Sequence, residues 1–236
     1  MPKNPTPHDK TKPNEFALGA FLIASLAAAA GALLLFGWLA EEVIKGDTNQ
    51  FDATVRGSVH AHATPLLTSI MQGFSFLGSV TWVLSFGLLV VCACFYFKRP
   101  RIAGFLAIAM TGASTLDYVL KLSFHRARPV AFFGVAPSSY SFPSGHSLGS
   151  LCFYGILASV LSDRMRPGKQ KFYVWLAAAF LVAMIGLSRI YLGVHYPSDV
   201  IAGYLAGAVW VTAVTVVDKI LLDRREKKIN LAKILE

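Results

Sequence analysis

The chain has 236 residues, of which 55% are hydrophobic and only 15% are charged, and its mean hydropathy is clearly positive. This composition lies outside the usual range of a soluble domain and indicates an integral membrane protein. The formal net charge of +9 requires no nucleic-acid partner, because the basic residues concentrate in loops and in the C-terminal segment, where we expect them to meet anionic lipid headgroups.

The first apolar segment covers residues 16–40 and contains no charged residue. A helix needs about 20 apolar residues to cross the hydrocarbon core, so this segment predicts a transmembrane helix. The alternative is a cleaved signal peptide processed near Ala27–Ala30, although the segment exceeds the roughly 7 to 15 apolar residues of such a peptide. Residues 1–15 include four prolines and mixed charges, which predicts a flexible tail.

The next long interval without Asp, Glu, Lys or Arg, residues 57–97, exceeds the length of one straight span. It holds either two spans, or one span near residues 79–97 that follows an apolar segment at the membrane interface. Four further apolar blocks come after it, at residues 102–120, 147–162, 172–187 and 200–217.

The positions of Lys and Arg decide between these alternatives. With a single span in the interval the chain has six spans, and 16 of the 22 basic residues fall on the side of both termini. By the positive-inside rule that side is cytoplasmic, and two spans in the interval would destroy the asymmetry. We therefore predict an all-α polytopic membrane protein with six transmembrane helices and an interfacial helix at residues 64–77, before the second span.

This topology predicts three parts: a cytoplasmic tail at residues 1–15, a membrane domain at 16–221 and a basic cytoplasmic tail at 222–236. The protein is then a multi-pass protein of the cell (inner) membrane. A GxxxG formed by Gly203 and Gly207 predicts close helix packing rather than dimerisation, and the pattern does not predict an oligomeric state.

Neither the cysteines nor an HxH pair predicts a metal or a disulfide. Cys92, Cys94 and Cys152 lie in apolar stretches, where thiols behave as small hydrophobic groups, and the first two lack CxxC spacing. His60 and His62 have no third ligand near them in the sequence. We expect no metal and no cofactor.

On the outer side, the second half of the chain keeps four cations beside apolar helices: Lys121, Arg126, Arg128 and Arg189. A basic residue at mid-membrane costs about 2.5 to 3.5 kcal/mol, so such residues reach outward, form pairs or serve a site. Lysine supplies a point charge and arginine a fork of donors that matches phosphate oxygens.

Two further outer segments carry histidines. In Phe142–His146 (FPSGH), which precedes an apolar block, the amides of a helix start would form an anion cradle, and Gly145 would let a ligand approach. Ordinary capping also explains Ser144. In Ser188–Asp199, the four-residue spacing of His195 and Asp199 would turn the carboxylate onto the imidazole, although Asp199 is also placed to cap the last helix.

Two histidines, one carboxylate and several cations, without an acidic cluster, point to phosphoryl transfer by electrostatic clamping. We assign His195, held by Asp199, as the nucleophile that forms a phosphohistidine, and His146 as the acid for the leaving oxygen and then the activator of water. The expected phosphate ligands are Lys121, Arg128, Ser144, Gly145 and Arg189. Arg126 is an accessory candidate for the phosphate field, and Asp117 either pairs with Lys121 or lines the access path.

These segments match KxxxxxxRP at Lys121–Pro129, PSGH at Pro143–His146 and SRxxxxxHxxxD at Ser188–Asp199. The sequence thereby resembles the type 2 phosphatidic acid phosphatase (PAP2) family, which shares its core with vanadium haloperoxidases and glucose-6-phosphatase. The resemblance covers at least residues 51–217, and all three motifs match without gaps. It implies the same residue roles and a six-helix membrane bundle with the site at the outer leaflet.

The resulting expectation is a metal-independent lipid phosphatase that acts at the periplasmic or extracellular face, with a membrane lipid phosphate and the bilayer as its partners. The substrates of bacterial family members are phosphatidic acid, phosphatidylglycerophosphate, diacylglycerol pyrophosphate and undecaprenyl pyrophosphate. Transfer of the phosphoryl group to another acceptor, haloperoxidase chemistry and a non-enzymatic anion or lipid transporter are the alternatives. The sequence does not select the headgroup.

Overall fold

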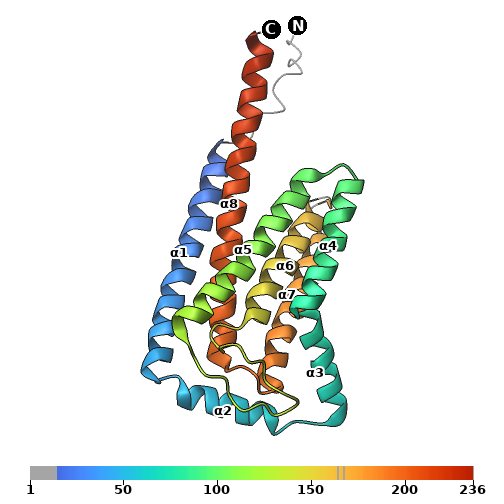
Figure 1. Cartoon of the computed structure of the whole chain (residues 1–236). Helices are drawn as coiled ribbons and strands as arrows, with labels where there is room; N and C mark the ends of the chain where they lie inside the picture. The colour runs from blue at the N-terminus through green and yellow to red at the C-terminus, as the bar shows by residue number, and fades with distance from the viewer. Residues whose placement is uncertain (1–14, 164, 167, 236) are drawn as a thin grey trace.

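The computed structural model describes residues 15–163, 165–166 and 168–235. Over these residues the chain forms a bundle of eight helices (Figure 1), whose bounds are α1 (Glu15–Lys45), α2 (Asn49–His60), α3 (Pro65–Leu77), α4 (Val80–Tyr96), α5 (Pro100–Phe124), α6 (Gly145–Ser162), α7 (Lys169–Tyr191) and α8 (Pro197–Leu235). The start of α1 and the end of α8 lie at the same end of the bundle.

The bundle contains up to six membrane spans. Helices α1, α5, α6, α7 and α8 are each long and apolar enough to cross a bilayer alone. The sixth span is the pair α3 and α4, which passes the same test together although the two helices meet at a bend of 49°. The all-α membrane fold is therefore confirmed, with five single-helix spans and a sixth where α3 and α4 count as one bent span. Helix α4 begins and ends within one residue of the predicted second span.

A helix at the predicted residues 64–77 is confirmed as α3, whereas its placement at the membrane interface stays a prediction. Its N-cap is Thr64, whose Oγ1 accepts a hydrogen bond from the amide of Leu67 at 3.2 Å. In Figure 1, α3 rises along the side of the bundle below α4, whereas α2, which we did not predict, lies across the end of the bundle. The sequence of α2 is polar, so its hydropathy gave no signal of a packed element.

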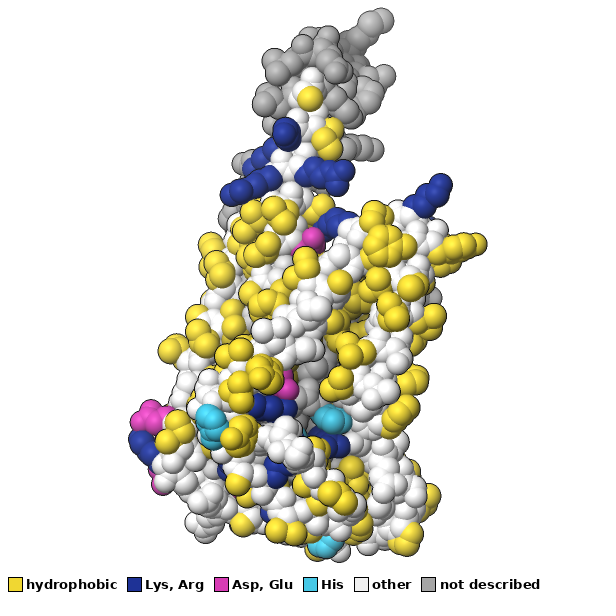
Figure 2. All heavy atoms as spheres, viewed as in Figure 1, with side chains coloured by type: hydrophobic (Ala, Val, Ile, Leu, Met, Phe, Trp, Pro, Cys, Tyr) yellow, Lys and Arg dark blue, Asp and Glu magenta, His cyan; other side chains and the backbone are white. Residues whose placement is uncertain are grey.

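The apolar groups are arranged as in a protein surrounded by lipid. A buried apolar cluster packs the four helices α4, α5, α6 and α7 together and includes Leu106, Phe153 and Ile185. Large apolar side chains also cover the outer surface. Figure 2 shows these hydrophobic side chains over the middle of the visible face, with Lys and Arg near the upper end and a second group, together with His, in the lower half. This apolar belt between two charged zones fits a bilayer.

The GxxxG of α8 packs inside the molecule. A Cβ atom on Gly203 would lie 2.6 Å from the carbonyl oxygen of Ser144, and one on Gly207 would lie 3.0 Å from the side chain of Leu151. These glycines allow α6 and α8 to approach closely. The predicted packing role is therefore confirmed, and it holds the start of α6 against α8.

At the opposite end, α8 continues without a break to Leu235, so the predicted basic tail is helical over residues 222–235. The predicted N-terminal tail lies outside the described residues except for Glu15, the first residue of α1. Cys92, Cys94 and Cys152 are free thiols.

Candidate active site

The three polar segments meet in one pocket at the end of the bundle opposite the termini. The pocket has a volume of about 480 Å³ and is walled by α4, α5, α6, the end of α7 and the loop that follows α5. Seven of the ten predicted site residues line it: Asp117, Lys121, Arg128, Gly145, His146, Arg189 and His195. Ser144 and Asp199 are fully buried beside it, and Arg126 is not among its lining residues.

His195 and Asp199 form the predicted pair. His195 lies just before α8 and is only 1% exposed, and its Nδ1 is 3.3 Å from Oδ2 of Asp199 in the first turn of that helix. Because a carboxylate accepts, Nδ1 is assigned the hydrogen, and Nε2 then presents its lone pair. Nη1 of Arg128, which is only a donor, lies 2.9 Å from Nε2 and fits this tautomer.

Asp199 also serves the capping role that the sequence suggested. Its Oδ2 accepts from the amide of Tyr196 at 2.9 Å, so the carboxylate reaches back to the residue before Pro197, where α8 begins. The same oxygen accepts from the buried hydroxyl of Ser141. The cap and the His195 contact thus use one carboxylate, which fixes its position relative to the imidazole.

Burial sets the protonation state of the nucleophile candidate. It lowers the pKa of His195 from the ordinary value of 6.5 to about 4, although Asp199 opposes this effect, and the cations Arg128 and Arg189 lower the pKa further. His195 is therefore neutral at neutral pH. A neutral imidazole with an unprotonated Nε2 is the form that attacks phosphorus.

This pKa shift predicts a pH dependence of stability. Between pH 6.5 and about 4 the unfolded chain binds a proton at His195 and the folded protein does not, so the free energy of unfolding falls as the pH decreases through this window. The loss from this one group is up to about 1.4 kcal/mol per pH unit. Lowering the pH from 7 to 4 should therefore lower the unfolding temperature of the wild type, measured in detergent, more than that of His195→Asn, which cannot titrate at this position. Equal decreases in both proteins would contradict the assignment.

Among the residues that the structure describes, Arg189 has no carboxylate partner. Its side chain, near the end of α7, is 7% exposed and donates through Nη1 to the hydroxyl of Ser75, while its buried Nε has no partner. The buried Oγ of Ser144 is also unpartnered. Unpaired buried donors and charge are costly, so these groups indicate that the pocket is built for an anion.

Lys121 and Asp117 share the opposite wall. They lie one turn apart on α5, and Nζ of Lys121 is 2.7 Å from Oδ2 of Asp117. This ion pair is one of the two roles predicted for Asp117. Both carboxylate oxygens would lie 2.8 Å from a Cβ atom on Gly145. Glycine is thus needed at this position for α5 to meet the start of α6, and Asp117 takes both predicted roles because it also lines the pocket.

Arg126 lies behind the nucleophile candidate rather than in the pocket. Its guanidinium forms ion pairs with Oδ1 of Asp199 at 2.6 Å and with Oδ2 of Asp52 at 2.8 Å, and it stacks over the ring of Tyr196 at 4.1 Å. Both carboxylates are almost fully buried. The geometry gives Arg126 a supporting contact with Asp199 in place of the expected contact with phosphate.

Sequence reasoning missed Asp52 of α2, Ser75 of α3 and Ser139 and Ser141 of the loop after α5. Ser139 accepts from Arg128 through its carbonyl oxygen at 2.7 Å and through Oγ at 3.0 Å. None of these residues lies in one of the three motifs. No pattern in the sequence singles them out, because Asp52 lies in a polar segment and its burial is known only from the packing of α2.

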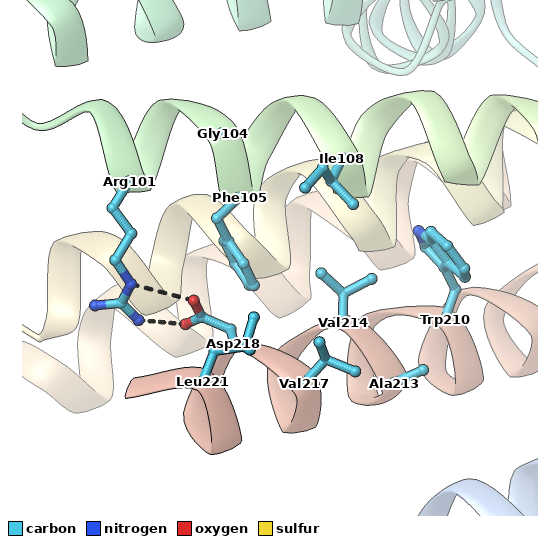
Figure 3. A pocket seen from close by; sticks show the side chains of 10 residues that line it. All are labelled: Arg101, Gly104, Phe105, Ile108, Trp210, Ala213, Val214, Val217, Asp218 and Leu221. Atoms are coloured by element: carbon cyan, nitrogen blue, oxygen red, sulfur yellow. Dashed lines mark hydrogen bonds and ion pairs between the residues drawn. The ribbon is translucent and has the colours of Figure 1, made fainter. Parts of the chain in front are cut away.

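A second hollow, of about 420 Å³, lies between α5 and α8 toward the terminal end of the bundle. Figure 3 shows its apolar lining from both helices and the ion pair between Arg101 and Asp218 at its edge. It contains no histidine, cysteine or hydroxyl group. Unlike this hollow, the pocket that holds His146 and His195 has groups that can act in catalysis.

Comparison with known proteins identifies the family of this chain. The sequence profile of the PAP2 superfamily matches residues 102–221. The chain is 34% identical over 145 residues to phosphatidylglycerophosphatase B of Bacillus subtilis, covering 61% of this chain and 71% of that protein. It is 32% identical over 127 residues to an undecaprenyl-diphosphatase of Sulfolobus acidocaldarius, covering 51% and 57%.

The fold agrees with the sequence match. The crystal structure of a transmembrane PAP2-type phosphatidylglycerolphosphate phosphatase from Bacillus subtilis superposes with a TM-score of 0.76 at 27% identity, over 81% of this chain and 96% of that one. The crystal structure of LpxE from Aquifex aeolicus superposes with a TM-score of 0.54 at 25% identity, over 70% and 94%. The chain thus belongs to the PAP2 superfamily and is a multi-pass membrane phosphatase of that family.

Proposed function

We propose that this protein is a metal-independent lipid phosphatase that hydrolyses a phosphate monoester or pyrophosphate of a membrane lipid through a phosphohistidine on His195. One observation carries the proposal. Nε2 of a buried, neutral imidazole lies within a pocket that also contains the buried guanidinium of Arg189, which has no carboxylate partner among the described residues.

In the first step Nε2 of His195 attacks phosphorus and the P–O bond to the lipid breaks, while His146 gives its proton to the leaving oxygen. The Nδ1–H group of His195 keeps its hydrogen bond to Asp199, and this carboxylate stabilises the positive charge that develops on the ring. Arg128, which contacts Nε2 in the free protein, moves its donor to a phosphate oxygen as the substrate enters.

In the second step His146 accepts a proton from water, the water oxygen bonds to phosphorus, and the P–N bond to His195 breaks. Inorganic phosphate leaves and both imidazoles return to their starting states. Lys121, Arg128, Arg189, the Ser144 hydroxyl and the amide of Gly145 hold the nonbridging oxygens in both steps, so that charge in the transition state is met by fixed donors.

The donors for this chemistry come from the chain itself. Among the residues that the structure describes, no three His, Cys, Asp or Glu side chains are grouped to hold a metal ion, whereas three basic side chains line the pocket. Clamping by side chains is therefore the mechanism that the ligand set supports.

The shape of the pocket favours a lipid substrate. The lining that contains His146 and Lys121 continues between α4 and α5 to Val80, Leu84 and Tyr118, which are 69%, 53% and 65% exposed. A phosphate held at the polar end would leave apolar chains in this opening, next to the bilayer. Two relatives, a phosphatidylglycerophosphatase and an undecaprenyl-diphosphatase, are by name phosphatases of membrane lipids, which agrees with this class.

We further propose that both termini are cytoplasmic and that the site faces the periplasm or the cell exterior. The loop between α4 and α5 and the end of α8 lie at the terminal end of the bundle (Figure 1) and carry Lys98, Arg99 and the basic residues after Asp218. The positive-inside rule assigns that end to the cytoplasm.

The test is release of inorganic phosphate by the purified protein in detergent with EDTA. The substrates are phosphatidic acid, phosphatidylglycerophosphate, diacylglycerol pyrophosphate and undecaprenyl pyrophosphate, and glycerol phosphate is the soluble control. We expect release from at least one lipid, at a rate that EDTA leaves unchanged and that exceeds the rate with glycerol phosphate. No release from any lipid would refute the proposal, and turnover that requires an added lipid or sugar acceptor would identify a transferase instead.

A further inference from the structure

A charged network lies behind His195, on the side away from the pocket. Asp199 accepts from Arg126, from the Ser141 hydroxyl and from the amide of Tyr196, in addition to its contact with His195. Its two oxygens are therefore shared among four donors. The charge that remains available to the imidazole depends on how strongly the other donors, above all the Arg126 guanidinium, draw on the same carboxylate.

Asp52 of α2 contacts two neighbours of Asp199, the Arg126 guanidinium and Ser198. Its side chain is 1% exposed, and its Oδ2 accepts from Nη2 of Arg126 at 2.8 Å, so Arg126 is divided between two carboxylates. The same residue accepts from the amide of Ser198 at 2.9 Å and from the Ser198 hydroxyl at 2.7 Å. Ser198 stands next to Asp199 in the first turn of α8.

Both contacts have a consequence at the nucleophile. Without the Asp52 charge, Asp199 would be the one carboxylate paired with Arg126 in this network, and the Asp199 oxygens would give less support to positive charge on His195 during attack. Without the Ser198 contacts, the first turn of α8 would lose the anchor that sets the position of Asp199. The pocket itself would keep its phosphate donors, since Asp52 does not line it.

We propose that Asp52 is a positioning residue for the nucleophile: by holding Arg126 and Ser198 it sets the place and the available charge of Asp199, so α2 is part of the active-site structure. Its chemical task, support of a charged His195, rests on the proposed phosphohistidine mechanism. No position outside the three motifs was expected to reach the nucleophile.

The first test compares the lipid phosphatase kinetics of Asp52→Asn with those of the wild type. Asparagine keeps the size of the side chain and one acceptor but removes the charge. We expect kcat per folded enzyme to fall by roughly 10- to 100-fold, the range seen when the hydrogen-bonding partners of metal-ligating side chains are removed, with KM within about twofold. Asp47→Asn is the matched control, because it removes an exposed carboxylate just before α2; it should leave both constants unchanged.

A double-mutant cycle separates the route through Arg126 from general damage. If Asp52 acts through Arg126, adding Asp52→Asn to Arg126→Met should cost less in kcat than it costs in the wild-type background. The proposal would be overturned if the losses in kcat of the two substitutions were fully additive. It would also be overturned if Asp52→Asn kept both the kcat and the unfolding temperature of the wild type. Restored activity in Asp52→Glu, which returns the charge, would support it.

A second readout does not depend on turnover. Inorganic vanadate takes a fifth ligand from a nucleophile and mimics the transition state, whereas inorganic phosphate needs only the pocket donors. Calorimetric titration of Asp52→Asn should show vanadate binding weakened by about tenfold and phosphate binding within about twofold. Equal weakening of both anions, or of neither, would contradict the inference. A wild type that binds vanadate but releases no phosphate from any lipid would refute the proposed function and leave this comparison valid.

Discussion

Replacement of His195 by asparagine should lower kcat for lipid phosphate hydrolysis by roughly 10⁴-fold or more, the scale on which loss of a nucleophile acts in enzymes with covalent intermediates. Asparagine retains a donor near Asp199 but has no lone pair corresponding to Nε2. Arg128 and Arg189 remain, so inorganic phosphate should still bind. The measurement is phosphate release per folded enzyme, with phosphate affinity measured by calorimetry on the same samples.

The control for this experiment is His125→Asn. His125 ends α5 in the left-handed conformation with φ of 49°, packs its ring against Tyr140 and does not line the pocket. Asparagine tolerates this backbone conformation, so we expect activity within about twofold of the wild type. If His195→Asn kept full activity, the phosphohistidine mechanism would be wrong and a transporter or lipid-binding role would account better for the cations.

The second large effect concerns His146, which lines the pocket at the start of α6 and packs against the break between α3 and α4 at Gly78. His146→Gln should lower lipid phosphate hydrolysis by about 10²- to 10⁴-fold, the usual contribution of a general acid or base. With 4-nitrophenyl phosphate, whose leaving group needs no proton, the first step should be affected far less. A burst of nitrophenolate equal to the enzyme concentration, followed by slow turnover, is the expected trace.

This burst distinguishes the assigned role from simple loss of binding. If His146 only held phosphate, both substrates would lose activity to the same degree and no burst would appear. A burst of wild-type size that is followed by wild-type turnover would show that another group, rather than His146, activates the water.

The membrane fold was predictable because the bilayer imposes a strong and local requirement on each span. Apolar segments of sufficient length identified every long helix, and the asymmetry of Lys and Arg selected six spans over seven. Pro65 and Thr64 mark the start of α3 in the sequence as well as in the structure. The helix α2 was missed because its stability comes from contacts with distant elements rather than from an apolar sequence of its own.

The candidate site was predictable where its residues lie in compact motifs. His195 and Asp199 are four residues apart, so a helix start brings them together without knowledge of the rest of the fold. Asp52 and Ser198 are 146 residues apart, and nothing local relates them. Arg126 shows the same limit: its sequence position resembles that of Arg128, and only the packing of α2 shows that it faces two carboxylates.

The most direct test of the phosphohistidine mechanism is mass spectrometry of His146→Gln enzyme that has been quenched with alkali during turnover of 4-nitrophenyl phosphate in EDTA. We expect one acid-labile phosphoryl group on the peptide that contains His195, and none when His195→Asn is added. A phosphoryl group on any other residue, or phosphate release without a covalent intermediate, would contradict it.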